Sequence, residues 1–310
     1  MSRVLVTGTD PVSRALVAAL RVEPWVERVI TVDDDLSRPR TLRSVMQGPI
    51  RAQAIDTIVH AAPPGSPTHP GRRAHVVDVE ATRELLRLAE EHATVRRLIY
   101  RSSSAVYHTG ADAVEVIDED HPLELSPAAP QWVRDRVEAD LALCAHAGLS
   151  RLGIVVLRCA EIFAPGAGSQ LHDWVQSRVC MRPLGYDPMV ELLSVEDAVR
   201  ALVAAAGAST QGVFNIPGAD ILPLSRLIAA CRRLDVPVPG PLLHPAYRLR
   251  TLMIGKEFRY DMNAGRFHFG AVLDGRRARA TLGYAPGHRI WFDGVRDARS
   301  RVTGREPRPS

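Results

Sequence analysis

Lysine is almost absent from this chain. Lys256 is the only lysine among the 310 residues, so arginine carries nearly all of the positive charge, and the formal net charge is only +4. A GC-rich coding sequence explains this bias more simply than a basic binding surface does. No zinc-finger, helix-turn-helix or RNA-binding signature accompanies the arginines, so nucleic acid is not an expected partner. Nucleic-acid binding through arginine stays open as one of three hypotheses about function.

Long hydrophobic runs are missing too. No stretch reaches the roughly 18 apolar residues that a membrane-spanning helix needs, so no membrane partner is expected. The opening MSRVLVTGTD runs directly into a strand-like segment, without the layout of a secretory signal. The four cysteines are far apart in the chain and form no CxxC motif. We therefore expect reduced thiols, no metal site and a cytoplasmic protein.

Short apolar runs alternate with amphipathic segments along the first half of the chain. The runs typical of buried strands lie at residues 3–8, 28–35, 55–64, 95–107 and 152–163. Helical spacing occurs between them, at 11–23, 79–93 and 132–148. This alternation predicts an α/β fold with a Rossmann-like, doubly wound parallel sheet over residues 1–163.

The second half is less regular, and residues 164–310 predict a smaller, mixed C-terminal cap. Within it, 194–209 has helical spacing and 212–218 is strand-like, so residues 192–218 are expected to return to the core. The proline-rich stretch 235–245 is predicted to be a loop.

A basic and aromatic segment follows at residues 246–270. It contains Arg248, Arg250, Lys256, Arg259 and Arg266 beside Tyr247, Phe258, Tyr260, Phe267 and Phe269. Arginine can hold phosphate and aromatic rings can stack on a base, which suits a nucleotide sugar. An acidic protein partner, a self-association face and a solvated helix beside core aromatics stay open as alternatives.

Nine short strings occur in an order typical of one enzyme family. They are VLVTG, ITVDDD, DTIVHAA, DVEAT, SSSAVY, VVLRCAEIFAPG, LLSVEDAVRAL, GVFNIPG and RARATLGYAP, between residues 4 and 286. Together they resemble the extended short-chain dehydrogenase/reductase family, in its NAD-dependent epimerase/dehydratase group. The chain is most similar to a UDP-glucose 4-epimerase-like subgroup in which the active-site tyrosine and lysine are not evident. The resemblance implies a nucleotide or nucleotide-sugar ligand and a homodimer formed through the helices at 79–93 and 132–148.

The resemblance also places a pyrophosphate on the turn after the first strand. The family pattern there is T-G-x-x-G-x-x-G, and this chain has TGTDPVSR, one residue shorter. Gly8 matches the first glycine, Pro11 lies near the second and Ser13 near the third. Pro11 lacks an N–H donor and Asp10 would repel a phosphate, so ordinary NAD binding is disfavoured. The alternative is a helix start that needs no ligand, with Asp10 as N-cap and Pro11 in the first position.

Two further residues match cofactor positions of the family. Asp33 ends the second strand, where an acid holds the adenosine ribose, and it favours NAD over NADP if a dinucleotide binds. A solvated acid in a turn is the alternative for Asp33. Ala61 follows the third strand and is assigned to the cofactor site by the same resemblance.

The catalytic positions of the family are altered. Ser103 matches the hydroxyl that hydrogen-bonds the reacting oxygen, although the match could shift by one residue to Ser102 or Ser104. The alternative role for all three is to cap free backbone groups at the end of the strand. Trp132 replaces the tyrosine acid/base and Arg136 replaces the lysine. An indole N–H does not exchange a proton near neutral pH. No Tyr-x-x-x-Lys occurs anywhere, because the residue four places before Lys256 is Leu252.

Two readings of function follow. The first is a degenerate family member that binds a nucleotide, a nucleotide sugar or a protein partner without catalysis. The second is an active, NAD-dependent nucleotide-sugar epimerase or dehydratase that uses a substitute acid. His108 and Glu161 are the substitutes chosen here, and Tyr107 and Asp135 also lie in the matched core.

Overall fold

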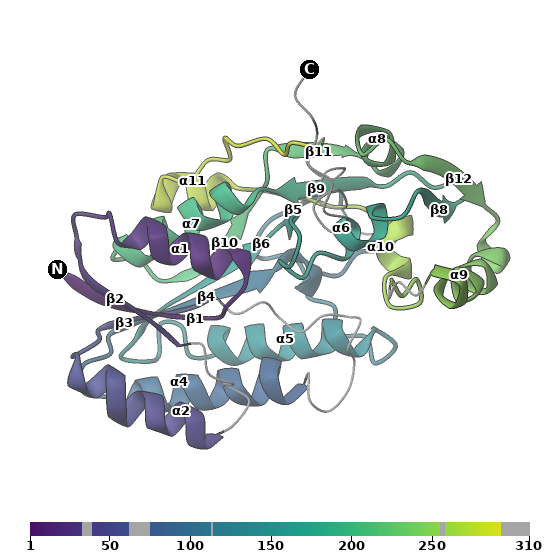
Figure 1. Cartoon of the computed structure of the whole chain (residues 1–310). Helices are drawn as coiled ribbons and strands as arrows, with labels where there is room; N and C mark the ends of the chain where they lie inside the picture. The colour runs from purple at the N-terminus through teal and green to yellow at the C-terminus, as the bar shows by residue number, and fades with distance from the viewer. Residues whose placement is uncertain (33–38, 62–74, 113, 255–257, 293–310) are drawn as a thin grey trace, which may run out of the picture.

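The computed structural model describes residues 1–32, 39–61, 75–112, 114–254 and 258–292. A six-stranded parallel sheet forms its centre, in the order β10-β6-β4-β3-β1-β2 (Figure 1). The strands are β1 (Ser2–Thr7), β2 (Val26–Val32), β3 (Thr57–His60), β4 (Arg97–Ser103), β6 (Gly153–Cys159) and β10 (Gly212–Ile216). The central strands are buried on both faces, which explains their continuous apolar runs. The predicted doubly wound parallel sheet is confirmed.

Helices cover both faces of this sheet. Figure 1 shows α1 (Pro11–Leu20), α7 (Val195–Gly207) and α11 (Arg276–Leu282) on one face. On the other face lie α2 (Pro39–Val45), α4 (Ala81–Glu91) and α5 (Gln131–Cys144). The π-helical segment η1 (Met46–Ile50) continues α2, and a second one, η2 (Val76–Glu80), leads into α4. Each layer buries its own apolar cluster against the sheet.

The chain reverses its direction of winding at β1. From β1 it passes to β2 on one side and then to β3 on the other. The carboxyl ends of β1 and β3 therefore meet at a topological switch point, where ligands bind in open α/β sheets. η3 (Ser104–Val106) follows β4 at the same edge of the sheet.

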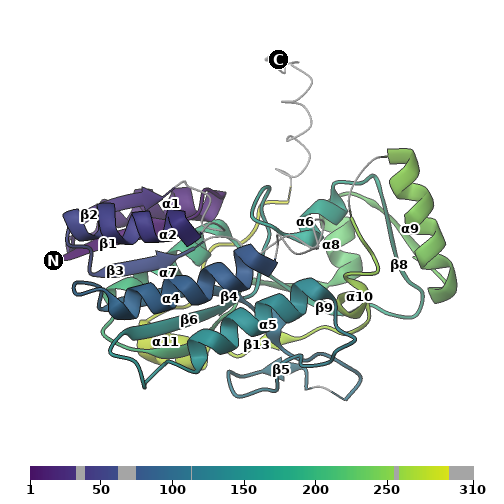
Figure 2. The ribbon, with the colours of Figure 1, turned by 90° about the horizontal axis from the view of Figure 1, so that it is seen from below.

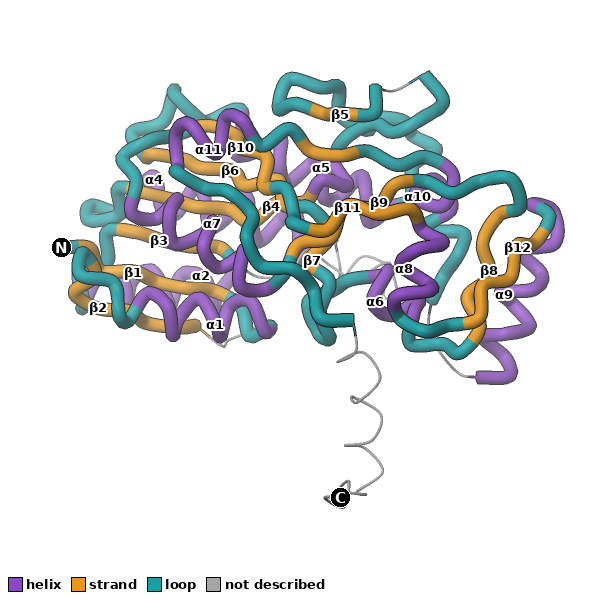
Figure 3. The backbone as a smooth tube through the Cα atoms, turned by 90° about the horizontal axis from the view of Figure 1, so that it is seen from above, coloured by secondary structure: helices purple, strands orange, loops and turns teal. Residues whose placement is uncertain are grey.

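The cap lies beyond the carboxyl edge of the sheet (Figure 3). It holds β7 (Glu161–Ile162), β9 (Met189–Leu193) and β11 (Asp220–Pro223) in one small sheet, and β8 (Val179–Pro183) with β12 (Leu234–Val238) in another. Its helices are α6 (Gln170–Val175), α8 (Leu224–Ala230), α9 (Gly240–Ile254) and α10 (Ala264–His268), and β5 (Val116–Ile117) pairs with β13 (Val272–Leu273) nearby. Figure 2 shows α9 at the end of the cap farthest from the main sheet. The domain division at residue 163 stays a prediction.

The predicted loop at 235–245 is wrong. Residues 234–238 pair in parallel with β8, and α9 begins at Gly240. Pro237 is tolerated because β12 lies at the edge of a two-stranded sheet, where a missing N–H costs no ladder bond on the open side.

Aromatic residues of the 246–270 segment form the core of the cap. Tyr247, Phe258, Tyr260 and Phe267 are buried around Trp174, whose indole donates to the Tyr247 hydroxyl at 2.7 Å. These four rings therefore pack inside the cap and are not free to stack on a base.

No helix among the described residues is both long and apolar enough to cross a membrane. All four cysteines are unpaired.

A buried ionic cluster ties β4, β6 and α5 together. Asp140 lies on α5 with a fully buried side chain, and Arg158 on β6 donates to it at 2.7 Å. Ser102 donates to the other carboxylate oxygen at 2.5 Å. Burying this pair is tolerable because the hydrogen bonds replace those to water.

We predict that Asp140→Ala lowers the free energy of unfolding by about 3–5 kcal/mol, because it leaves the Arg158 charge buried without its partner. Urea denaturation followed by circular dichroism measures this change. The matched control is Glu91→Ala, which removes an exposed pair with Arg87 and should leave stability unchanged within error. Equal stability of both variants would contradict the prediction.

Candidate functional site

The turn after β1 is an internally capped helix start. Gly8 has a φ of +104°, a conformation that side chains with a Cβ rarely adopt. Asp10 is the N-cap of α1, and its carboxylate accepts the backbone N–H of Ser13 at 2.9 Å. Pro11 is the first helical residue. The Ser13 side chain is buried, and its hydroxyl also contacts Asp10.

The second oxygen of the Asp10 carboxylate forms an ion pair with Arg101. The guanidinium donates to it at 2.9 Å, and both side chains are almost completely buried. Arg101 lies on β4, so the pair joins the start of α1 to a strand that is separated from β1 by β3. The negative charge at the start of α1 is therefore already balanced inside the protein.

These contacts do not fit a pyrophosphate held on this turn. A phosphate at a helix N-terminus is bound by free N–H groups of the first turn. Pro11 has no N–H and that of Ser13 is taken by Asp10, so Val12 alone among these three positions keeps an uncommitted N–H. A phosphate would also have to compete with Asp10 for the Ser13 N–H and for Arg101. We therefore assign no chemical step to NAD.

The other two cofactor positions are placed differently. Ala61 is fully buried at the end of β3, and its carbonyl accepts the Ser13 hydroxyl at 3.3 Å. It is thus part of the packing beneath the turn. Asp33 lies outside the described residues, so its role in holding a ribose stays a prediction.

The three catalytic positions lie together at the end of β4 and the start of α5. Arg136 donates to the Ser103 hydroxyl at 3.3 Å, and its guanidinium lies 4.6 Å from the centre of the Trp132 ring. The Ser103 hydroxyl also accepts the Ala105 N–H at 3.2 Å, which is the capping role considered as an alternative. The Trp132 indole donates to the Met262 carbonyl at 2.8 Å. Tertiary structure thus brings together the residues that match the family positions.

Arg136 remains a cation at this place. Burial lowers its pKa to about 10, while the nearby charges of Asp78 and Glu161 act in the opposite direction. Its pKa is still far above neutral, so Arg136 can attract an anion or donate hydrogen bonds but cannot act as an acid or base near pH 7. The space next to Ser103 and Arg136 is small, with a volume of about 40 Å³.

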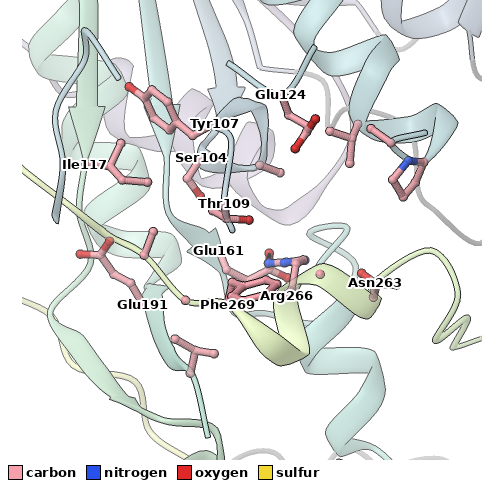
Figure 4. A pocket seen from close by; sticks show the side chains of 18 of the residues that line it. Ser104, Tyr107, Thr109, Ile117, Glu124, Glu161, Glu191, Asn263, Arg266 and Phe269 are labelled. Carbon is pink, nitrogen blue, oxygen red and sulfur yellow. Dashed lines mark hydrogen bonds and ion pairs between the residues drawn. The ribbon is translucent and has the colours of Figure 1, made fainter. Parts of the chain in front are cut away.

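A larger cavity lies between the sheet and the cap, with a volume of about 320 Å³. Figure 4 shows Ser104, Tyr107 and Glu124 on one side of it, with Glu161, Arg266 and Phe269 on the opposite side. Its walls are partly apolar with a few polar groups, as in small-molecule pockets, and its volume is at the lower end of their usual range.

Glu161 faces both spaces. Its carboxylate pairs with Arg266 and accepts the Ser169 hydroxyl at 2.7 Å. Burial opposes its charge, but Arg266 and the Ser169 hydrogen bond outweigh burial and hold its pKa below the ordinary value. Glu161 is therefore an ionised group at neutral pH, suited to accept a hydrogen bond or a proton and unsuited to donate one.

His108 is directed elsewhere. Its ring contacts Glu124 at 2.9 Å and lies 3.7 Å from Asp112, and its side chain is 41 % exposed. Its neighbours Tyr107 and Thr109 line the large cavity, as does its partner Glu124, whereas His108 itself is not among the lining residues. The Tyr107 hydroxyl donates to Asn215 at 2.6 Å, and burial raises its pKa to about 12. Of the two substitute acids predicted, Glu161 is the one in the cavity wall.

Two acidic residues of the cavity, Glu124 and Glu191, were not predicted. Glu191 lies on β9, and its two carboxylate oxygens accept the backbone N–H groups of Leu273 at 2.9 Å and Gly218 at 3.3 Å. Burial raises its pKa to about 7, although both hydrogen bonds act to lower it. A signal was present in the sequence, since an acid interrupts the apolar run MVELL. A carboxyl group that titrates near neutral pH can both donate and accept a proton.

The arginines of the 246–270 segment have separate roles. Arg266 reaches the large cavity, whereas Arg250 is buried and bonds Ser177 inside the cap. Arg259 pairs with Asp261 at the surface, and Arg248 is exposed. Lys256 lies outside the described residues. Among the described arginines of this segment, Arg266 is therefore the one that lines the cavity.

The described residues also hold no group of three or more His, Cys, Asp and Glu side chains arranged for a metal ion.

Comparison with known proteins identifies one family. The model of the "NAD dependent epimerase/dehydratase family" matches residues 4–216. A "3-diazoavenalumate denitrifying reductase" from Streptomyces is 29 % identical over 314 residues, covering 94 % of this chain and 99 % of the reductase. An uncharacterized protein of Mycobacterium tuberculosis is 28 % identical over 305 residues, covering 91 % of this chain and 80 % of that protein.

A similar fold occurs in MoeE5, solved with UDP-glucuronic acid and NAD. It superposes with a TM-score of 0.68 at 19 % identity, over 97 % of this chain and all of MoeE5 (100 %). The fold resemblance predicted from the sequence is confirmed.

Glu191 generates a prediction about pH. Because its folded-state pKa is about 7 and its ordinary value is 4.5, the folded protein holds this proton more tightly than the unfolded chain does. The resulting stability is complete below about pH 4.5 and is lost as the pH rises through 7, by an amount on the order of 3 kcal/mol. In Glu191→Gln this part of the pH dependence should vanish.

Urea denaturation at intervals from pH 5 to pH 8 measures the slope. Glu196→Gln, an exposed acid on α7, is the control and should keep the wild-type slope. The prediction is wrong if the Glu191→Gln slope equals that of the wild type.

Proposed function

Because this chain belongs to the NAD dependent epimerase/dehydratase family, we propose that it binds a nucleotide sugar in the cavity between sheet and cap, without tyrosine–lysine redox chemistry. One observation carries the proposal. A cavity of about 320 Å³ with a few polar groups in its wall is lined in part by Trp132, the indole at the position that the sequence match assigns to the family's acid. We infer from this that ligand binding occurs without tyrosine-type chemistry in this chain.

The cavity wall supports binding of a polyhydroxylated, anionic ligand. Arg266 can exchange part of its contact with Glu161 for a phosphate, because a guanidinium offers five donors. Ser104 and Thr109 provide hydroxyls, and Phe269 provides an aromatic face. MoeE5, which shares the fold, was solved with UDP-glucuronic acid.

The family's acid/base position supports the absence of tyrosine-type proton transfer. The indole N–H of Trp132 is committed to the Met262 carbonyl, and Arg136 lies over the ring as a permanent cation. Neither group can take a proton from a substrate hydroxyl near neutral pH.

A second candidate function is an active enzyme that uses carboxyl groups. Glu191 favours it, because a cavity-lining acid with a pKa of about 7 can exchange protons with a substrate hydroxyl or carbonyl. Ionised Glu161 would then orient the ligand through Arg266. The reductase name of the Streptomyces relative also favours an active enzyme.

We expect UDP-glucose or UDP-glucuronic acid to bind the purified protein, and Arg266→Gln to weaken that binding at least tenfold, about 1.4 kcal/mol. Isothermal titration calorimetry measures both affinities, and circular dichroism verifies that the variant is folded. Arg259→Gln is the matched control, because Arg259 comes from the same segment but pairs with Asp261 at the surface. Equal loss in both variants, or no binding by the wild type, would contradict the proposal.

Turnover separates the two candidate functions. The binding proposal expects no conversion of UDP-sugars by the wild type, detected by NMR of the sugar signals. Conversion that falls at least a hundredfold in Glu191→Gln while ligand affinity is kept would establish the second candidate instead.

We also propose a homodimer formed through α4 and α5. A groove of about 410 Å³ on this surface is lined by Leu125, Val137, Leu141 and Ala142, with charged residues including Arg83 and Glu138 among its other lining residues. Leu125 and Leu141 are 69 % and 41 % exposed, so this surface presents two large apolar side chains to solvent. A second copy would bury them.

Leu141→Glu should convert the dimer into a monomer, because it places a charge in the apolar groove of both copies. Size-exclusion chromatography with light scattering measures the mass. Leu184→Glu, which changes an exposed leucine of the cap, is the control and should leave a dimer. A wild-type monomer would refute the proposal.

A further inference from the structure

We infer that the Asp10 carboxylate occupies the place of a cofactor phosphate at the start of α1, and that the buried Asp10–Arg101 pair excludes dinucleotides from this turn. The inference concerns residues outside the sheet–cap cavity and does not depend on what binds there. It rests on the hydrogen bonds, the charge balance and the packing around the turn.

The hydrogen bonds of Asp10 support this inference, because they join its carboxylate to donors of the kind that hold a phosphate. One Asp10 oxygen accepts the Ser13 N–H at 2.9 Å, and the other accepts an Arg101 N–H at 2.9 Å. A helix N–H and an arginine are the two kinds of donor that commonly hold a phosphate. Here both are already satisfied by a carboxylate that belongs to the chain.

The charges lead to the same conclusion. Arg101 is 2 % exposed and Asp10 is 7 % exposed, so the two charges are shielded from water and balance one another. A pyrophosphate would bring more negative charge against Asp10 in a place of low dielectric constant. It would have to break the pair, which leaves Asp10 buried without compensation.

The loop after β7 packs against the turn at the start of α1. An ideal Cβ on Gly166 would lie 3.6 Å from the Pro11 ring, so the backbone of the loop after β7 is close to the first residue of α1. Further along the sheet edge, the space beside Ser103 and Arg136 measures about 40 Å³, which is room for a few water molecules.

The test is NAD affinity before and after the charge is removed. The wild type should show no saturable NAD binding at millimolar concentration by isothermal titration calorimetry. Asp10→Asn keeps the shape of the cap but frees Arg101, and it should show saturable NAD binding in the same titration, at least tenfold tighter than the detection limit that the wild type does not reach. ADP should follow the same order, because it carries the same pyrophosphate.

A charge-balanced variant covers the case in which Asp10→Asn fails to fold. Asp10→Asn/Arg101→Gln removes both charges, so no cation is left buried alone. It should bind NAD more tightly than the wild type but less tightly than Asp10→Asn, because the arginine is missing. Micromolar NAD binding by the wild type, or no gain in whichever variants fold, would overturn the inference.

UDP-glucose titration of proteins with an intact Asp10 distinguishes this inference from the proposed function. UDP-glucose also carries a pyrophosphate, so its affinity for the cavity is compared in the wild type and in Arg266→Gln, where the turn stays closed. A gain in NAD affinity without any UDP-glucose binding would uphold the inference and reject the cavity ligand.

Discussion

A charge buried at the edge of the sheet must have a partner, and this constraint organises the whole site. Asp10 and Arg101 satisfy each other at the start of α1, and Asp140 and Arg158 do so between α5 and β6. A third pair, Glu161 with Arg266, joins β7 to α10 in the wall of the large cavity. Each pair consumes donors and acceptors that a ligand would otherwise use. The chain therefore keeps the scaffold of its family while much of its polar chemistry is directed inward.

Two regions of the site use their polar groups differently. At the turn and at the position matched to the family's tyrosine, internal contacts take up the polar groups: Asp10 caps α1, and Trp132 donates to the Met262 carbonyl. The cavity under the cap has a partly apolar wall with a few polar groups. This contrast is the physical argument for our proposal that the chain binds a ligand without tyrosine–lysine redox chemistry.

The cap shows how aromatic residues can be misread from sequence. Tyr247, Phe258 and Phe267 lie beside arginines in the chain, which suggests a surface that stacks on a base. In three dimensions they surround Trp174 and form the hydrophobic core of the cap. The cap is small and has few apolar residues to bury, so its aromatic side chains are needed for packing. On α10, Phe267 packs into that core, whereas its neighbour Arg266 lines the cavity.

The sequence by itself determined the parallel sheet, its family and the absence of a Tyr-x-x-x-Lys pair, because local periodicity and residue identity are written along the chain. It also determined that Asp10 and Pro11 suit a helix start, since capping acts over three residues. Only the tertiary structure decided that Arg101, 91 residues away, neutralises Asp10. It likewise decided that Glu191 is buried in a cavity wall and that His108 pairs with Glu124 without lining the cavity itself. Charge pairing, burial and pKa depend on neighbours that folding brings together, and no local pattern encodes those distances.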